Sequence, residues 1–270
     1  MLTSTLGWLP AANPSISKSY IANDANASLF ARPSFKGKFM PVNNRMFLEM
    51  FSDRERIAHY ADGPRRFTPG IDAVRRMTAL LLAEHAPADA HVLVLGAGGG
   101  LELEALAQAQ AGWHFTGVDP AGPMLDLARE TMGEDADRAH LIEGYIDAAP
   151  AGPFDAATCL LTLHFLDRNE RVRTLSEMNR RMKPGAPLVV VHSSFPQDEP
   201  FRTRWLARYA AYAVASGAEP AQTEQARAAV GASLALLTPD EDETCLRDAG
   251  FKDVELFYAA FTWRGWVSRA

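Results

Sequence analysis

Four glycines occupy five consecutive positions, 96–100, in the stretch HVLVLGAGGGLELEALAQ. Glycine adopts backbone conformations that other residues avoid, and it lets a ligand approach the main chain closely. Where such a turn joins a strand to a helix, backbone N–H groups meet the positive end of the helix. We therefore predict that Gly96, Ala97 and Gly98 line a cofactor site, with tight packing of strand on helix as the alternative.

An acidic residue ends the next predicted strand. Asp119 stands 23 residues after Gly96 and is followed by Pro120. A carboxylate at this place can accept hydrogen bonds from both hydroxyls of a ribose, or it can cap the following helix. The sequence thus predicts a pocket for an adenosine moiety. A dinucleotide would place a pyrophosphate on the helix end, whereas S-adenosylmethionine carries no phosphate.

Strands and helices alternate through the middle of the chain. Helices of 10–16 residues separate the predicted strands, which indicates right-handed crossovers and a parallel sheet. Two more strands are predicted within 252–270, after a short helix that begins at Thr238. The preceding strands are expected at 91–95, 114–119, 139–144, within 154–166 and within 186–195, and the intervening helices at 101–111, 122–133 and 167–182.

Two further regions frame this alternation. Residues 1–41 are rich in Asn, Ser and Pro, and are expected to form an extension that is loosely ordered or ordered by a partner. Residues 42–270 then form the main domain, beginning with helices at 44–61 and 69–86. An Ala/Arg-rich helical insertion over about 195–235 is expected as a lid at the ligand-binding edge of the sheet. It carries aromatic residues that indicate core, a dimer face or a substrate box: Phe195, Phe201, Trp205, Tyr209 and Tyr212.

The composition of the chain limits the kinds of molecule that it is expected to bind. The formal net charge of −6 argues against general binding to nucleic acid. No stretch approaches the roughly 18 apolar residues of a membrane span, and no signal peptide is recognisable. Cys159 and Cys245 fit core positions and a cytoplasmic location, and two distant cysteines do not have the spacing of a zinc site. The clearest basic cluster is predicted to lie mostly on a solvated helix face, and consists of Arg168, Arg171, Arg173, Arg180, Arg181 and Lys183.

Taken together, these motifs resemble class I S-adenosylmethionine-dependent methyltransferases. Order and spacing from about residue 64 onward are most similar to the enzymes that carboxymethylate the wobble uridine of tRNA. The segments that carry the resemblance are PRRFTPG, LGAGGG, LTLHFLDRNER, RRMKPGAPLVV and CLRDAGFKDVELFYAAFTWRGWV. The resemblance implies a Rossmann-like seven-stranded α/β sheet, mostly parallel with a C-terminal antiparallel strand, and helices on both faces.

The resemblance also implies the cofactor S-adenosylmethionine and a set of contacts to it. Val94 stands where the family has an acidic residue, and Glu102 is a candidate to replace that residue. Val214 stands where an arginine binds the extra carboxylate of carboxy-S-adenosylmethionine, so ordinary methyl transfer or a weakened cofactor site is expected. Ile71 and Leu160 replace a tyrosine and an asparagine. The predicted cofactor contacts are Gly96, Ala97, Gly98, Asp119, Pro120, Tyr145, Ile146, Leu160 and Arg66.

Methyl transfer from a sulfonium is an in-line displacement in which the protein mainly positions the acceptor. His164 is the predicted catalytic or acceptor-orienting residue, with His192 and Tyr60 as other candidates. We expect a small-molecule acceptor and allow for a homodimer. The alternatives are a tRNA-modifying enzyme and a non-catalytic binding protein with a degraded cofactor pocket.

Overall fold

The computed structural model describes residues 62–270. The predictions for residues 1–41, for a helix at 44–61 and for Tyr60 lie outside this part of the chain. The predicted domain division at residue 41 therefore stays a prediction.

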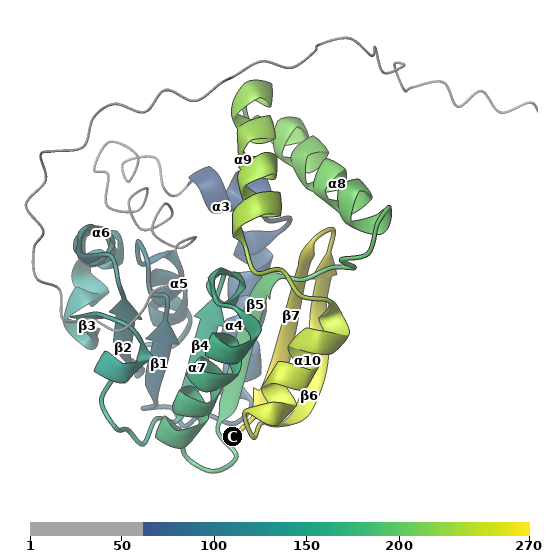
Figure 1. The fold of residues 1–270 in the computed structure, drawn as a ribbon. Helices are drawn as coiled ribbons and strands as arrows, with labels where there is room; N and C mark the ends of the chain where they lie inside the picture. The colour runs from purple at the N-terminus through teal and green to yellow at the C-terminus, as the bar shows by residue number, and fades with distance from the viewer. Residues whose placement is uncertain (1–61) are drawn as a thin grey trace, which may run out of the picture. The chain divides into compact units, whose positions relative to one another are not determined.

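A seven-stranded sheet with the order β3-β2-β1-β4-β5-β7-β6 organises the described residues (Figure 1). The first five strands pair in parallel, and β7 runs antiparallel to both β5 and β6. This topology confirms the predicted fold class. The strands are β1 (His91–Leu95), β2 (His114–Asp119), β3 (Ala139–Glu143), β4 (Ala156–Leu160), β5 (Pro187–Ser193), β6 (Lys252–Ala260) and β7 (Trp263–Arg269).

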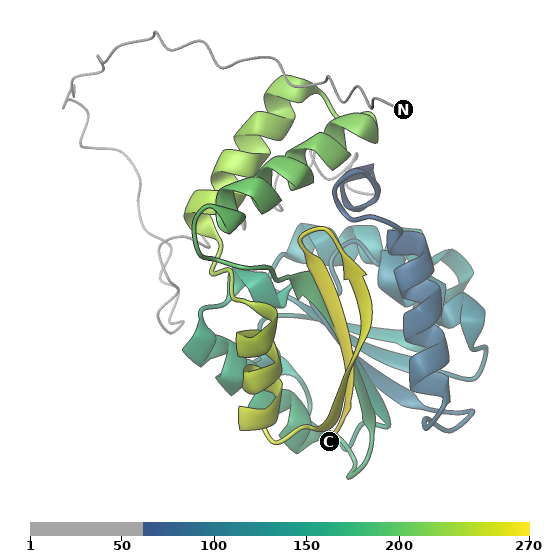
Figure 2. The same ribbon diagram turned by 90° about the vertical axis from the view of Figure 1, so that its right-hand side faces the viewer.

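Helices cover both faces of the sheet, as predicted. Figure 2 shows α4 on one side, and α7 and α10 on the other. The helix α5 packs beside α4, and α6 packs beside α5. The helices are α3 (Asp62–Phe67), α4 (Ile71–Ala83), α5 (Leu101–Ala109), α6 (Gly122–Met132), α7 (Arg168–Arg181), α8 (Phe201–Ala215), α9 (Pro220–Ser233) and α10 (Pro239–Asp248), with short 3₁₀ helices η1 (Gly133–Arg138), η2 (Ile146–Ala148) and η3 (Leu163–Phe165).

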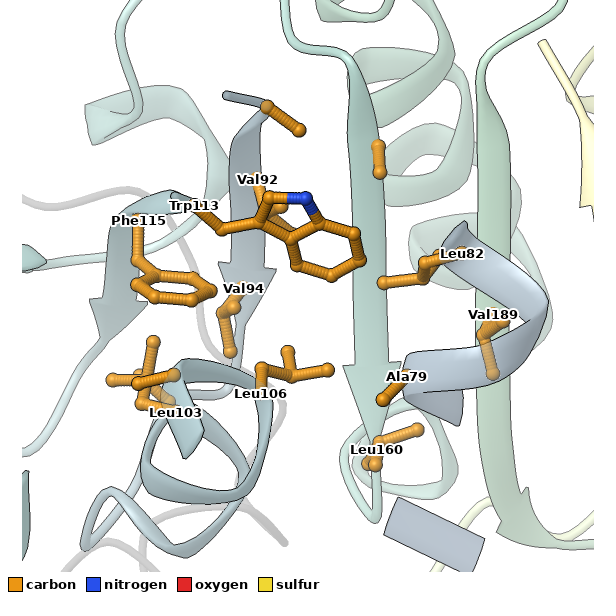
Figure 3. Close-up of a cluster of buried hydrophobic side chains, with 14 of the residues drawn as sticks. Ala79, Leu82, Val92, Val94, Leu103, Leu106, Trp113, Phe115, Leu160 and Val189 are labelled. Carbon is orange, nitrogen blue, oxygen red and sulfur yellow. The ribbon is translucent and has the colours of Figure 1, made fainter. Parts of the chain in front are cut away.

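The central strands are buried because helices cover both of their faces. Alternate side chains of β1 point to opposite faces, and Val92 and Val94 lie in the cluster on the α4–α5 side. Figure 3 shows Trp113 and Phe115 beside these valines. The register pairs Val94 with Thr158 of β4, so both side chains face the same helices.

The predicted insertion forms two helices, α8 and α9, which pack against one another. Both follow the carboxyl end of β5 in the chain. Tyr209 is buried and stacks on Phe67 of α3 with ring centroids 5.3 Å apart, whereas Phe201 is exposed. Of these two aromatic residues of the insertion, Tyr209 thus packs inside the fold and Phe201 lies on the surface. No helix in the described part combines the length and apolar composition of a membrane span.

The basic cluster departs from its prediction at two positions. Arg168, Arg173 and Arg180 are exposed on α7, as expected for a solvated face. Arg171 and Arg181 are instead buried, because each donates hydrogen bonds to carboxylate and carbonyl oxygens inside the fold. Most of the cluster is thus exposed, as predicted, and the charge pattern did not single out these two arginines as the buried members.

Candidate functional site

The glycine turn joins β1 to α5 as predicted, and its backbone requires glycine. Gly96, Gly98 and Gly100 all have positive φ angles, of 79°, 48° and 83°. A Cβ atom at Gly96 would overlap the side chain of Thr162, only 2.9 Å from its Cβ. Thr162 follows β4 and was not predicted as a site residue. The sequence signal for it was a polar residue within the apolar stretch LLTLHFL, two positions after the end of β4.

Four backbone N–H groups of the turn are engaged inside the protein, among them that of Gly100, which donates to the carbonyl oxygen of Ala97 at 3.0 Å. Gly96 and Ala97 both donate to the carbonyl oxygen of Val118, at 2.8 and 3.1 Å. Gly98 donates to Oδ2 of Asp119 at 2.9 Å. A phosphate-binding turn directs such groups at its ligand instead. The arrangement therefore favours a nucleoside ligand over a pyrophosphate at this edge.

Asp119 lies at the carboxyl end of β2 and faces this turn. Its Oδ2 accepts from Gly98 N–H, and its Oδ1 accepts from Ala121 N–H at 2.9 Å. Burial raises the pKa of Asp119 above its ordinary value, and the two backbone hydrogen bonds only partly offset that rise. The carboxylate is thus fixed in orientation, with one remaining lone pair on each oxygen.

Tyr145 and Ile146 follow β3 at the same edge. The Tyr145 side chain is 42% exposed, and partial burial together with the charge of Asp119 raises the pKa of its phenol. The phenol and the carboxylate therefore share one region of the edge. Ile146 is buried in the apolar cluster beneath η2. Their predicted contact with an adenine ring stays a prediction.

The remaining predicted cofactor contacts occupy different surroundings. Pro120 is partly buried directly after Asp119. Leu160 packs in the core cluster on the α4–α5 side, where Figure 3 shows its side chain. Arg66 is exposed on α3, a helix that contacts α4 and α8. The structure thus brings the turn, Asp119 and Tyr145 to one edge, while the roles of Leu160 and Arg66 stay predictions.

Glu102 lies in the first turn of α5, directly after the glycines, and is buried. Burial raises the pKa of its carboxyl to about 7, although Thr158 and the positive charge of Arg75 oppose the rise. Neither Oε1 of Glu102 nor the hydroxyl of Thr158 completes a hydrogen bond. Since Thr158 is the strand neighbour of Val94, the carboxyl lies on the face where the predicted replacement would place it.

His164 lies in η3, just past β4, and is buried. Its Nδ1 accepts a long hydrogen bond of 3.4 Å from Ser193 N–H, and its ring meets Trp263 edge-on at 5.6 Å. Burial, together with the nearby His192 and Arg171, holds the pKa of His164 well below its ordinary value. The ring is therefore neutral at pH 7, with its proton on Nε2 as a hydrogen-bond donor.

Comparisons with known proteins agree with this geometry. Residues 92–185 match the family model described as a methyltransferase domain. The chain is 30% identical over 217 residues to the carboxy-S-adenosyl-L-methionine synthase of Chromohalobacter salexigens, covering 76% of this chain and 78% of that protein. It is 36% identical over 126 residues to the demethylmenaquinone methyltransferase of Lactiplantibacillus plantarum, covering 45% and 52% of the two chains.

Solved structures extend the likeness to the fold. An O-methyltransferase family protein from Burkholderia thailandensis aligns with a TM-score of 0.59 at 16% identity, over 84% of this chain and 62% of that one. The relatives do not confirm the predicted wobble-uridine carboxymethyltransferase subfamily, because those that match across most of the chain are named carboxy-S-adenosyl-L-methionine synthases. The chain belongs to the S-adenosylmethionine-dependent methyltransferase family to which these synthases are related.

Proposed function

We propose that this protein transfers a methyl group from S-adenosylmethionine to a small-molecule acceptor at the carboxyl edge of β1, β2 and β4. The single observation that carries the proposal is the partly buried carboxylate of Asp119, which faces the glycine turn and accepts a hydrogen bond from Gly98 N–H. In support, four N–H groups of the turn are already engaged, which leaves them unavailable to a pyrophosphate.

The hydrogen-bonding capacity of Asp119 fits a ribose. An ionised carboxylate has about four acceptor sites, and Gly98 and Ala121 use one on each oxygen. The two that remain match the two hydroxyls of a ribose. The lack of a Cβ atom at Gly96 lets Thr162 pack directly against the turn. Tyr145 and Ile146 are the proposed neighbours of the adenine.

The cofactor supplies an activated methyl group, so the chain has to hold and orient the acceptor. His164 suits this role as a donor, because its Nδ1 is engaged by Ser193 and its proton is on Nε2. A neutral imidazole in this tautomer can orient an acceptor oxygen through a hydrogen bond. We therefore propose His164 as an acceptor-orienting residue rather than a general base.

Synthesis of carboxy-S-adenosylmethionine is the second candidate, favoured by the 30% identity to a synthase of that name. Against it, Val214 of α8 is exposed and offers no cation at the position where the sequence resemblance predicts an arginine. An unpaired carboxylate would lose solvation on entering the site without a compensating charge. Ordinary methyl transfer is therefore the favoured reaction.

Calorimetric titration tests the cofactor part of the proposal. We expect S-adenosylmethionine and S-adenosylhomocysteine to bind, and NADH not to bind. Asp119→Ala should abolish binding, whereas Asp126→Ala, on the exposed surface of α6, should leave it unchanged. Binding of NADH alone would overturn the proposal. Tighter binding of carboxy-S-adenosylmethionine than of S-adenosylmethionine would favour the second candidate.

The acceptor class needs a separate experiment. The protein is incubated with methyl-labelled S-adenosylmethionine and, in parallel, with a panel of small hydroxyl and amine compounds or with bulk tRNA. We expect label in the small-molecule fraction and a loss of transfer in Asp119→Ala. Label in tRNA would instead support the tRNA-modifying alternative.

A further inference from the structure

Three ionisable side chains meet inside the fold, away from the glycine turn. Arg171 of α7, Asp242 of α10 and His192 of β5 are each at most 1% exposed. Arg171 Nη1 donates to Asp242 Oδ1, and Nε2 of His192 lies 3.1 Å from the same oxygen. The cofactor site uses none of these groups. A buried cluster of this kind is costly unless its members are paired, so its arrangement calls for a physical reason.

The charge state of the cluster follows from its contacts. Burial would raise the pKa of Asp242, but His192 and Arg171 outweigh burial and hold that pKa below its ordinary value. Burial lowers the pKa of His192, although Asp242 opposes this. The cluster therefore holds one arginine cation and one carboxylate, with the imidazole of His192 beside them. The carboxylate fixes the guanidinium, which leaves the other end of Arg171 to bind elsewhere.

That other end reaches two connecting segments, one that follows η3 and one that follows α9 and is also bridged to Ser194 through Leu237. Nη2 of Arg171 donates to the carbonyl oxygen of Ala235 at 2.8 Å and to that of Leu166 at 3.2 Å. Leu166 directly follows η3, which carries His164. Ala235 lies two residues after the end of α9, where the insertion returns to the sheet. One planar guanidinium thus ties the η3 turn to the return of the insertion.

Stability alone does not account for this arrangement. Replacing a buried ion pair with apolar residues of similar volume is often neutral or stabilising, so such a pair is weak grounds for a purely stabilising role. A guanidinium differs in that its donors lie on separate nitrogens in a fixed plane, so it binds a carboxylate at one end and carbonyl oxygens at the other, whereas the three donors of a lysine share a single nitrogen and an apolar residue has none. The distinctive property of Arg171 is therefore geometric.

We propose that Arg171, oriented by Asp242 and His192, is a positioning residue that fixes the η3 turn and the insertion return relative to one another. Through these two segments it sets the place of His164 and the base of the α8–α9 lid. The link to acceptor binding rests on the proposed function, whereas the fixing of the two segments does not. An experiment can therefore refute the link to acceptor binding without refuting the fixing of the two segments, and the reverse.

Two variants separate positioning from stability. Arg171→Lys keeps a cation beside Asp242, but one ammonium cannot replace the fork to both carbonyl oxygens. The double variant R171M/D242L removes both charges, so it leaves no unpaired charge buried, and it also removes the fork. Arg168→Met is the matched control, because Arg168 lies on the same helix and pairs with Asp248 at 2.8 Å on the surface.

Hydrogen exchange measured by mass spectrometry is the primary readout. We expect peptides covering 163–167 and 233–238 to exchange roughly tenfold faster or more in both variants, as for loss of a charge-assisted hydrogen bond. Peptides from β1 and β4 should keep their protection, and Arg168→Met should match the wild type throughout. Uniform loss of protection across the sheet, or unchanged exchange in the two segments, would overturn the proposal.

Two further measurements connect the segments to function. In ¹⁵N-histidine NMR spectra, we expect His164 to hold the Nε2–H tautomer in the wild type and Arg168→Met, and to show mixed tautomers in Arg171→Lys. S-adenosylhomocysteine should bind all variants equally, since the glycine turn and Asp119 are untouched. Weakened binding in Arg171→Lys would contradict a role confined to the acceptor side. Failure of the wild type to bind would count against the proposed function only.

Discussion

The variant Glu102→Gln replaces an ionisable carboxyl in the first turn of α5, directly after the glycine turn, with an amide that does not titrate. Its effect on the free energy of unfolding should therefore depend on pH. In the folded protein the pKa of Glu102 is raised from 4.5 to about 7, mainly by burial. Between these two values the folded state retains a proton that the unfolded state has lost. The free energy of unfolding of the wild type should therefore fall as pH rises through this window, relative to the variant.

The magnitude follows from the same two values. Each pH unit between 4.5 and about 7 contributes about 1.4 kcal/mol, which gives about 3 kcal/mol over the window. Glutamine keeps the shape of the side chain and does not titrate. A buried amide that lacks one partner would cost about 1–3 kcal/mol at every pH, so it would shift the whole difference without changing its slope.

Urea unfolding at a series of pH values measures this difference directly. We expect the stability of Glu102→Gln minus that of the wild type to increase by about 3 kcal/mol from pH 4.5 to 7.5. Glu104→Gln is the control, since Glu104 lies on the same helix and is only partly buried. Parallel pH profiles for Glu102→Gln and the wild type would refute the reasoning, because they would mean that Glu102 ionises normally in the folded protein.

Three more predictions address the turn, the ribose contact and a helix cap. Asp119→Asn should weaken S-adenosylhomocysteine binding roughly 10- to 100-fold, measured by calorimetry at a temperature where the variant is folded, because the amide offers one acceptor oxygen in place of two. Gly96→Ala should lower the free energy of unfolding by about 2 kcal/mol or more, because the new Cβ would overlap Thr162. The control Gly133→Ala should lower it by about 1 kcal/mol, because Gly133 also has a positive φ angle but has open space around it. Equal costs would contradict the packing argument. Thr238→Ala should lose about 1 kcal/mol in urea unfolding, since it breaks a capping box, and no loss would indicate that solvent replaces the cap.

Much of the fold could be predicted from the sequence because its determinants are local. The apolar run at 91–95, the glycines after it and the helical spacing at 101–109 are all short-range patterns, and each formed the expected element. The same holds for Asp119 at the end of β2. Helix ends were less accurate, as with the predicted helix at 101–111, because the final turn depends on neighbouring packing.

The site was only partly predictable for the opposite reason. Thr162 lies against Gly96 although 66 residues separate them, and the contact exists only because β4 packs beside β1. Glu102 likewise reaches Thr158 through the packing of α5 on the sheet. No local pattern records a contact that two distant strands create.

The sequence by itself determined the alternation of strands and helices, the glycine turn and the acidic residue that faces it. Tertiary structure decided which charges are buried. Arg171 looked like its exposed neighbours on α7, yet it is fully buried because Asp242, some 70 residues later in the chain, neutralises it. The periodicity of polar and apolar residues assigns a residue to one face of its own helix. The partner that offsets the free-energy cost of burying a charge comes from another element of the fold.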